Sequence, residues 1–184
     1  MKNTPVKYLI ICITSCCLAH TVQAGQNDFT KGKVLPEFGQ VAMVEADMLI
    51  PKGTTFTVLF DAAEGTSPGS INRTLNTAAR FLNMHGEAGV PEENIKLAIV
   101  FHGKASFDLT NDDFYSEKFD AVENTNANLI QALKEKGVRL ILCGQSAAYH
   151  DISKQDLVPG VEMALSAMTA HALLQQDGFT LNPF

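Results

Sequence analysis

The chain alternates short apolar strand patterns with helical patterns, and this order constrains its fold more than any other feature. Residues 55–60 (TFTVLF), 95–101 (IKLAIVF) and 138–142 (VRLIL) are near-continuous apolar runs, typical of strands buried on both faces. Between them, apolar residues recur at helical spacing from 71 to 82, and a second helix is expected over 123–136. Strands joined by helices form βαβ units, so the sequence predicts an α/β fold with three α/β/α layers and a mostly parallel sheet.

The remaining segments extend this architecture. Residues 25–52 show no strong period and are interpreted as an N-terminal arm with one short strand, packed on the domain or on a neighbouring subunit. Residues 53–184 are predicted to form the α/β domain. Its later elements are expected to be a loop over 103–120, a short helix over 145–150, a strand over 161–165, a helix over 166–176 and a strand over 179–181.

Residues 1–24 have the pattern of a secretory signal peptide. A start with two lysines precedes an apolar stretch over 8–18, and 22–24 (VQA) form a small-residue cleavage site. Cleavage after Ala24 predicts a periplasmic or secreted protein. An alternative is a lipoprotein, because the box that ends at Cys16 (ITSC) resembles the site cut by lipoprotein signal peptidase.

Charge and apolar content exclude several classes of protein. The chain has 14 basic and 20 acidic side chains, net −6; without the two lysines of the signal, 12 basic side chains face 20 acidic ones, net −8. A nucleic-acid partner is not expected, since binding one requires a basic face. No apolar run after the signal approaches the roughly 20 residues of a membrane span. A content of 46% hydrophobic and 18% charged residues is typical of a globular domain.

One cysteine remains once the signal is removed. Three of the four cysteines lie in the signal, so Cys143 has no partner for an intrachain disulfide or for a zinc site built on several thiolates. No cofactor and no metal site are predicted. Cys143 ends a strand pattern and precedes a short helix, whose first amides would lower the pKa of the thiol. Gly144 would let the backbone turn tightly beside the sulfur. A cysteine that only packs in the core is the alternative.

The carboxyl ends of parallel strands meet at one edge of the sheet, where open α/β folds bind ligands. Asp61 follows the first strand pattern, His102 the second, and Cys143 ends the third. The His102 imidazole could take a proton from Cys143 or bind a metal, and a bond to local backbone is the alternative. His171 is expected to pack within the last helix. Further residues expected around the sulfur or in the pocket are Gly144, Gln145, Ser146, Asn72 and Tyr115.

Several short motifs, in their order and spacing, resemble the DsrE/DsrF-like family of sulfur-relay proteins. The resemblance covers about residues 55–184, and its motifs include 142–146 (LCGQS), 156–161 (DLVPGV), 99–103 (IVFHG), 126–130 (NANLI) and 166–169 (SAMT). It implies a single α/β/α domain with a five-stranded parallel sheet in the order 4-3-2-1-5. In this order His102 and Cys143 would end neighbouring strands, about 5 Å apart between strand axes.

The resemblance also implies a function. In the sulfurtransferase members, a cysteine after the third strand carries a persulfide and passes the sulfur to a partner protein, and Cys143 matches that position. Members commonly assemble as trimers or hexamers, so a homotrimer or homohexamer is expected for this chain. The expected function is therefore that of an exported sulfur carrier or sulfurtransferase using Cys143, with His102 tuning the thiol and a sulfur donor or acceptor protein as partner. The signal and the arm depart from the cytosolic relay subunits, so a role in tRNA modification is not expected.

Two other functions stay open at this point, and so does the question of whether the protein is an enzyme. The first is a non-catalytic oligomeric module that binds a small anion, a metal or a redox ligand at the carboxyl ends of the strands. The second is a purely structural assembly subunit, in which Cys143 would only pack.

Overall fold

A five-stranded sheet lies at the centre of the computed structural model, which describes Gly25 and residues 28–183. The signal peptide predicted over residues 1–24 lies outside the described residues. The sheet order is β4-β3-β2-β1-β5 and each pairing is parallel, so the predicted class and strand order are confirmed. The strands are β1 Phe56–Ala62, β2 Ile95–Phe101, β3 Arg139–Cys143, β4 Glu162–Ala164 and β5 Thr180–Asn182.

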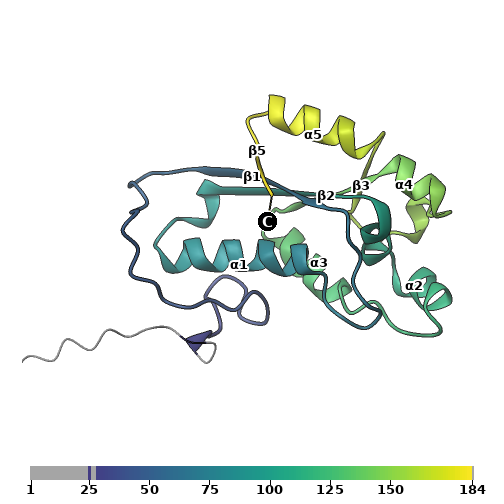
Figure 1. Ribbon diagram of the computed structural model, residues 1–184, viewed down its shortest axis with the longest axis horizontal. Helices are drawn as coiled ribbons and strands as arrows, with labels where there is room; N and C mark the ends of the chain where they lie inside the picture. The colour runs from purple at the N-terminus through teal and green to yellow at the C-terminus, as the bar shows by residue number, and fades with distance from the viewer. Residues whose placement is uncertain (1–24, 26–27, 184) are drawn as a thin grey trace, which may run out of the picture.

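Helices cover both faces of this sheet (Figure 1). Helix α1 (Arg73–Glu87) packs on β1 and β2, and α3 (Ala127–Glu135) packs beside it on β3. Helix α5 (Ala167–Gln176) lies on the opposite face, against β2 and β3. The shorter helices are α2 Asp112–Lys118 and α4 Gly144–Tyr149, with 3₁₀ turns at η2 Glu92–Asn94, η3 Gly103–Leu109 and η4 Lys154–Asp156.

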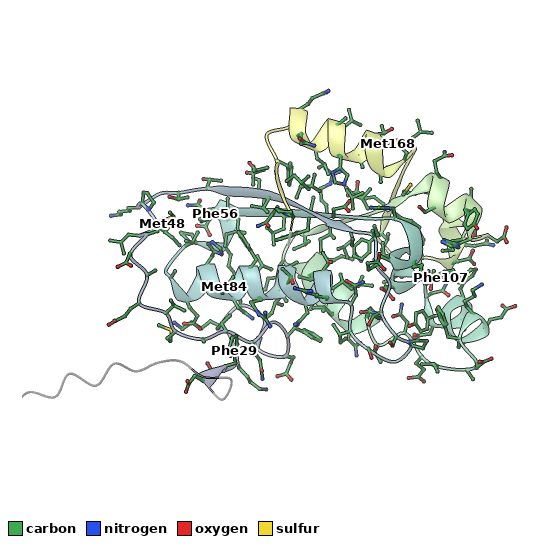
Figure 2. The ribbon with its side chains drawn as sticks, viewed as in Figure 1. Phe29, Met48, Phe56, Met84, Phe107 and Met168 are labelled. Atoms are coloured by element: carbon green, nitrogen blue, oxygen red, sulfur yellow. The ribbon has the colours of Figure 1, made fainter. Side chains whose placement is uncertain are left out.

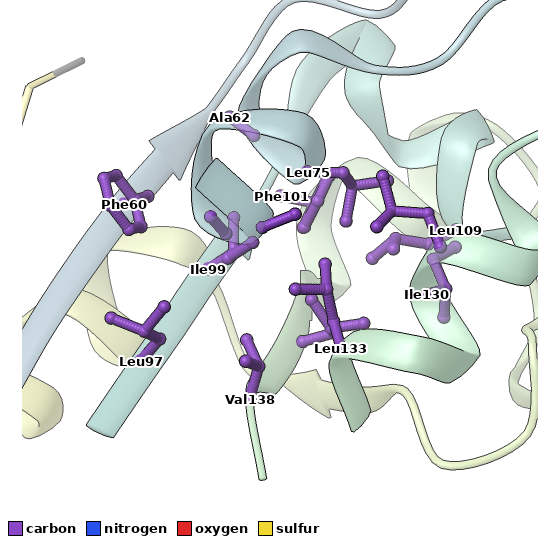
Figure 3. Close-up of a cluster of buried hydrophobic side chains, with 14 of the residues drawn as sticks. Phe60, Ala62, Leu75, Leu97, Ile99, Phe101, Leu109, Ile130, Leu133 and Val138 are labelled. Carbon is purple, nitrogen blue, oxygen red and sulfur yellow. The ribbon is translucent and has the colours of Figure 1, made fainter. Parts of the chain in front are cut away.

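Successive strand side chains alternate between two hydrophobic cores. The larger core, under α1 and α3, contains Phe60, Ile99 and Phe101 (Figure 3). The smaller core, under α5, contains Leu59 and Val100 together with residues of α5. Because both faces are covered, the three inner strands β1, β2 and β3 are apolar at most positions, which explains the runs seen in the sequence.

The segment between β2 and β3 differs from the prediction. The expected loop contains η3 and α2, and the helix expected over 123–136 begins only at Ala127. Tyr115 is the one buried residue of α2, so this helix has no apolar stripe that a sequence pattern could reveal. Asn124 delays α3, because its buried amide donates to the carbonyls of Asp108 (3.0 Å) and Thr110 (2.7 Å) and holds the chain in a turn.

The N-terminal arm packs along α1 and adds no strand to the sheet. In its described part, the one β pairing is an isolated antiparallel bridge between Thr30 and Val41, so the short strand expected there is not found. Asn83 of α1 holds the arm: its buried side chain accepts the amides of Val34 (3.1 Å) and Leu35 (2.8 Å). No helix of the described residues is long and apolar enough to cross a membrane.

Candidate functional site

A cavity of about 430 Å³ opens at the carboxyl edge of the sheet, on the face that carries α5. Asp61, His102 and Cys143 line it from the ends of β1, β2 and β3. Strand side chains alternate between faces, so these three share the face of the small core with Leu59 and Val100. The structure thus brings the strand-end histidine and cysteine into one cavity.

Cys143 ends β3 at the start of α4 and is 6% exposed. Burial raises the pKa of its thiol, but four hydrogen-bond donors together outweigh this effect. The Ser146 hydroxyl and the backbone amides of Ser146, Ala167 and Gln145 bond the sulfur, so the pKa of Cys143 lies below its ordinary value. The Ser146 oxygen also accepts the Gly103 amide at 3.0 Å, which leaves the hydroxyl proton free to face the sulfur.

One of these donors comes from α5, which sequence reasoning missed. Ala164 of β4 pairs with Cys143 of β3, so the chain leaving β4 must pass the sulfur before α5 begins. Ser166 caps α5 by accepting the Thr169 amide at 3.0 Å, and the Ala167 amide then bonds the sulfur. The available signal was a capping serine directly after a predicted fourth strand, at the same edge of the sheet as Cys143.

Gly144 has a different role from the one expected. It is absent from the described residues with positive φ, so the turn itself does not require glycine. A Cβ at Gly144 would lie 2.6 Å from the carbonyl oxygen of Ala164 and 3.2 Å from that of Leu165. Glycine is required because the β4–α5 connection lies directly against it, and this close approach brings the Ala167 amide to the sulfur.

Two histidines share the carboxylate of Asp61. Nε2 of His102 lies 3.0 Å from Oδ2, and Nε2 of His171 lies 2.7 Å from Oδ1. The His102 ring, expected to face Cys143, has its described hydrogen bond with Asp61. His171 comes from α5 and also lines the cavity, although it was expected only to pack. No local pattern could reveal this contact, since Asp61 and His171 are 110 positions apart.

Two residues expected in the pocket lie on the other face of the sheet edge. The described residues that line the cavity do not include Asn72 or Tyr115. Asn72 caps α1 by accepting the Thr74 amide (2.8 Å), and its side chain donates to Asp108 (2.7 Å). Tyr115 is buried in the large core, where its ring centroid lies 4.6 Å from that of Phe119. Burial raises the pKa of Tyr115, and the nearby charge of Asp108 raises it further.

The rim of the cavity is apolar on the side of α5. Met168 is 81% exposed there, and Leu165, just before the helix, is 72% exposed. Figure 2 shows Met168 on α5 toward the end of the molecule that also carries Phe107, with Met48 and Phe56 at the opposite end. Among the residues that the structure describes, no group of three or more His, Cys, Asp or Glu could hold a metal ion.

Comparisons with known proteins agree with this fold. Similar solved structures include protein MTH1491 of Methanobacterium thermoautotrophicum, titled as a protein of unknown function (16% identity, TM-score 0.53, covering 70% of this chain and 99% of that one). They also include the ychN protein of E. coli (17% identity, TM-score 0.52, covering 71% of this chain and 100% of that one). No curated protein matches.

The family comparison covers the sheet and the cavity together. The model of the DsrE/DsrF-like family matches residues 55–183, which run from β1 to the end of the described chain and contain every residue that lines the cavity. This match spans well over half of the sequence, and the chain belongs to the DsrE/DsrF-like family.

Proposed function

We propose that this protein is a sulfur carrier, with sulfurtransferase activity, that holds a persulfide on Cys143. The observation that carries the proposal is a thiol of lowered pKa in the wall of an open cavity. Membership of the DsrE/DsrF-like family supports a sulfur-relay role. A lowered pKa increases the fraction of thiolate at neutral pH, and the thiolate is the form that attacks sulfur.

The proposed reaction has two steps. In the first, the Cys143 thiolate attacks the sulfane sulfur of a donor; a Cys143–sulfur bond forms, the donor's bond to that sulfur breaks, and the leaving group departs with the electron pair. In the second, an acceptor thiolate attacks the outer sulfur of the persulfide and the Cys143 thiolate leaves. The amides of Gln145 and Ala167 and the Ser146 hydroxyl stabilise the thiolate at both ends of this cycle.

We also propose that the protein is exported and that it self-associates. Residues 1–24 would be a signal peptide, 25–52 an arm and 53–184 the DsrE-like domain, which gives a periplasmic or secreted protein. We infer a homotrimer or homohexamer that meets a sulfur donor or acceptor protein. The exposed apolar side chains of Leu165, Met168 and others on the described surface support contact with another protein chain.

One observation favours the alternative, a non-catalytic binding module. Cys143 is only 6% exposed, and a residue so covered is slow to meet a bulky donor. In this alternative the cavity would hold a small anion or a redox ligand, and the Cys143 side chain would only line its wall; a metal is not proposed, since no group of described residues could hold one.

The intact mass of the protein separates the two functions. The purified, reduced protein and the Cys143→Ser variant are each incubated with a sulfane donor. The intact mass of both is measured by mass spectrometry before and after treatment with a reductant. The sulfur-carrier proposal expects a gain of one sulfur atom in the wild type, reversed by the reductant and absent from the variant. No gain, together with slow alkylation of Cys143, would leave the binding module as the function.

A further inference from the structure

Asp61 is an acid on an apolar face. It lies in β1 two positions after Leu59, which is fully buried in the small core under α5, and the side chains of both point to this face. The Asp61 side chain itself is 36% exposed, because it lies beyond the core in the open cavity, and it has two hydrogen-bonding partners there. Here the partners are His102 from the end of β2 and His171 from α5, so three separate elements meet at one carboxylate.

The carboxylate fixes the tautomer of both rings. An ionised carboxylate only accepts hydrogen bonds, so Nε2 of His102 and Nε2 of His171 must each carry a proton. In the neutral rings Nδ1 is then the atom that accepts a proton.

Asp61 and its two histidines lie beside the reactive thiol of Cys143. Phe101 of β2 pairs with Leu142 of β3, so the next residues, His102 and Cys143, end neighbouring strands at the same level. Four titratable groups line this cavity: Asp61 of β1, His102 directly after β2, Cys143 of β3 and His171 of α5. Helix α4 lines it with Gln145 and Ser146, which carry no charge. A proton held by either histidine is therefore within the cavity where the sulfur chemistry is proposed.

We propose that Asp61 is a positioning residue that holds His102 and His171 ready to protonate the thiolate leaving a persulfide donor and to deprotonate the acceptor thiol. This inference rests on the proposed function of Cys143 as a sulfur carrier. It assigns the donor to the class of persulfides of thiols, R–S–SH. It also means that the cavity transfers protons as well as supplying the Cys143 nucleophile.

The two half-reactions balance. In the first, the Cys143 thiolate attacks the outer sulfur of R–S–SH, the S–S bond breaks, and the leaving thiolate takes the proton of an imidazolium to become R–SH. In the second, the neutral imidazole takes the proton of an acceptor thiol, whose thiolate attacks the Cys143 persulfide and releases the Cys143 thiolate. The imidazolium is regenerated, and the net change is transfer of one sulfur between two thiols.

The chemistry of the leaving group indicates this class of donor. A thiolate is a moderate base, with a thiol pKa near 8.5, so it is protonated at neutral pH and its departure is helped by a positioned acid. Thiosulfate instead releases sulfite, a weaker base that gains less from protonation. The histidines positioned by Asp61 should therefore accelerate transfer from persulfides more than transfer from thiosulfate.

Two donors and one isosteric variant test the inference. Loading of Cys143 is followed by intact mass in the wild type and in Asp61→Asn, with glutathione persulfide or with thiosulfate as donor, between about pH 5.5 and 9. We expect the variant to load about 10²-fold more slowly from the persulfide near pH 7 and to change little with thiosulfate. Glu162→Gln, on the exposed Arg139 pair outside the cavity, is the matched control.

The outcomes separate this inference from the proposed function. If the wild type gains no sulfur from either donor, the proposed function fails and the inference fails with it. If the wild type loads but Asp61→Asn loads at the wild-type rate, or slows equally with both donors, Asp61 is structural and only the inference is overturned.

Nitrogen NMR of the rings gives a test that does not depend on turnover. In the wild type, both His102 and His171 should carry their neutral-form proton on Nε2. In Asp61→Asn the new amide donates to one of the rings, whose proton must then move to Nδ1. A wild-type protein with Nδ1–H on either ring would refute the positioning role even if the variant failed to fold.

Discussion

Asp108 offers a quantitative test of the packing at the carboxyl edge. Its side chain is 2% exposed, and its Oδ2 accepts hydrogen bonds from Asn72 Nδ2 (2.7 Å) and from the Thr66 amide (3.2 Å). Burial raises the pKa of Asp108 from 3.8 to about 6, although the two hydrogen bonds partly oppose this. The ionised carboxylate is therefore less favourable in the folded protein than in the unfolded chain.

The difference sets the sign and the size of a pH effect. The folded state binds the proton of Asp108 more tightly, so this group's contribution to stability is fully present below about pH 4 and is lost as the pH rises through about 6. The change in pKa corresponds to a loss of about 3 kcal/mol at neutral pH. Asp108→Asn keeps the shape and one acceptor oxygen but cannot ionise, so it should avoid this loss.

Urea unfolding followed by circular dichroism measures the effect directly. The free energy of unfolding of Asp108→Asn, minus that of the wild type, should increase by about 2 kcal/mol between about pH 4.5 and pH 7.5, because about 1 kcal/mol of the loss has already occurred at pH 4.5. Asp113→Asn, an exposed acid in the first turn of α2, is the control and should change stability by less than about 1 kcal/mol at either pH. A difference for Asp108→Asn that stays constant with pH would refute the reasoning that this carboxyl is desolvated.

Three further substitutions have expected outcomes. Ser146→Ala removes a donor to the Cys143 sulfur, so the thiol pKa should rise and the pH profile of iodoacetamide alkylation should shift upward, whereas Ser116→Ala, on α2 and outside the cavity, should leave it unchanged. Gly144→Ala forces a Cβ against the Ala164 carbonyl and should lower the free energy of unfolding by about 1–3 kcal/mol in urea titrations. Asn83→Ala removes the bonds that hold the arm to α1, at roughly 1 kcal/mol for each lost bond, and limited proteolysis should then cut the arm faster than in the wild type.

The inner strands are the elements that the sequence predicts best, because burial on both faces requires a continuous run of apolar residues. Strand β2 spans the predicted residues, Ile95–Phe101, and β3 is displaced by one residue. The same logic places His102 and Cys143 at the edge of the sheet that carries the cavity. Helix α2 escaped prediction because Tyr115 alone is buried, so its formation depends on the cap at Asn111 and on packing beneath it.

The contacts around the thiol show where sequence reasoning reaches its limit. The face on which each strand-end residue lies follows from alternation: Asp61 lies two positions after Leu59, and Cys143 lies two after Ile141 in the same core. Alternation says nothing about what covers that face. The Ala167 amide and the His171 ring reach the cavity only because β4 returns beside β3 and delivers α5 across it, which is a property of the tertiary fold.

The two faces of the sheet edge differ in what their polar groups do, and this difference can be tested by separating stability from reactivity. On the face of α1, the side chains of Asn72 and Asp108 bond each other and the backbone of the loops, so their hydrogen bonds serve the fold. On the face of α5, the donors around Cys143 act on an atom whose charge they stabilise. Asn72→Ala should therefore lower the free energy of unfolding by about 1–3 kcal/mol and leave the alkylation rate of Cys143 unchanged. Ser146→Ala should slow the alkylation of Cys143 near neutral pH, and it should also lower the free energy of unfolding by roughly 1 kcal/mol, because the Gly103 amide loses its acceptor. If Asn72→Ala slows alkylation as much as Ser146→Ala does, the two faces are coupled through η3 and cannot act separately.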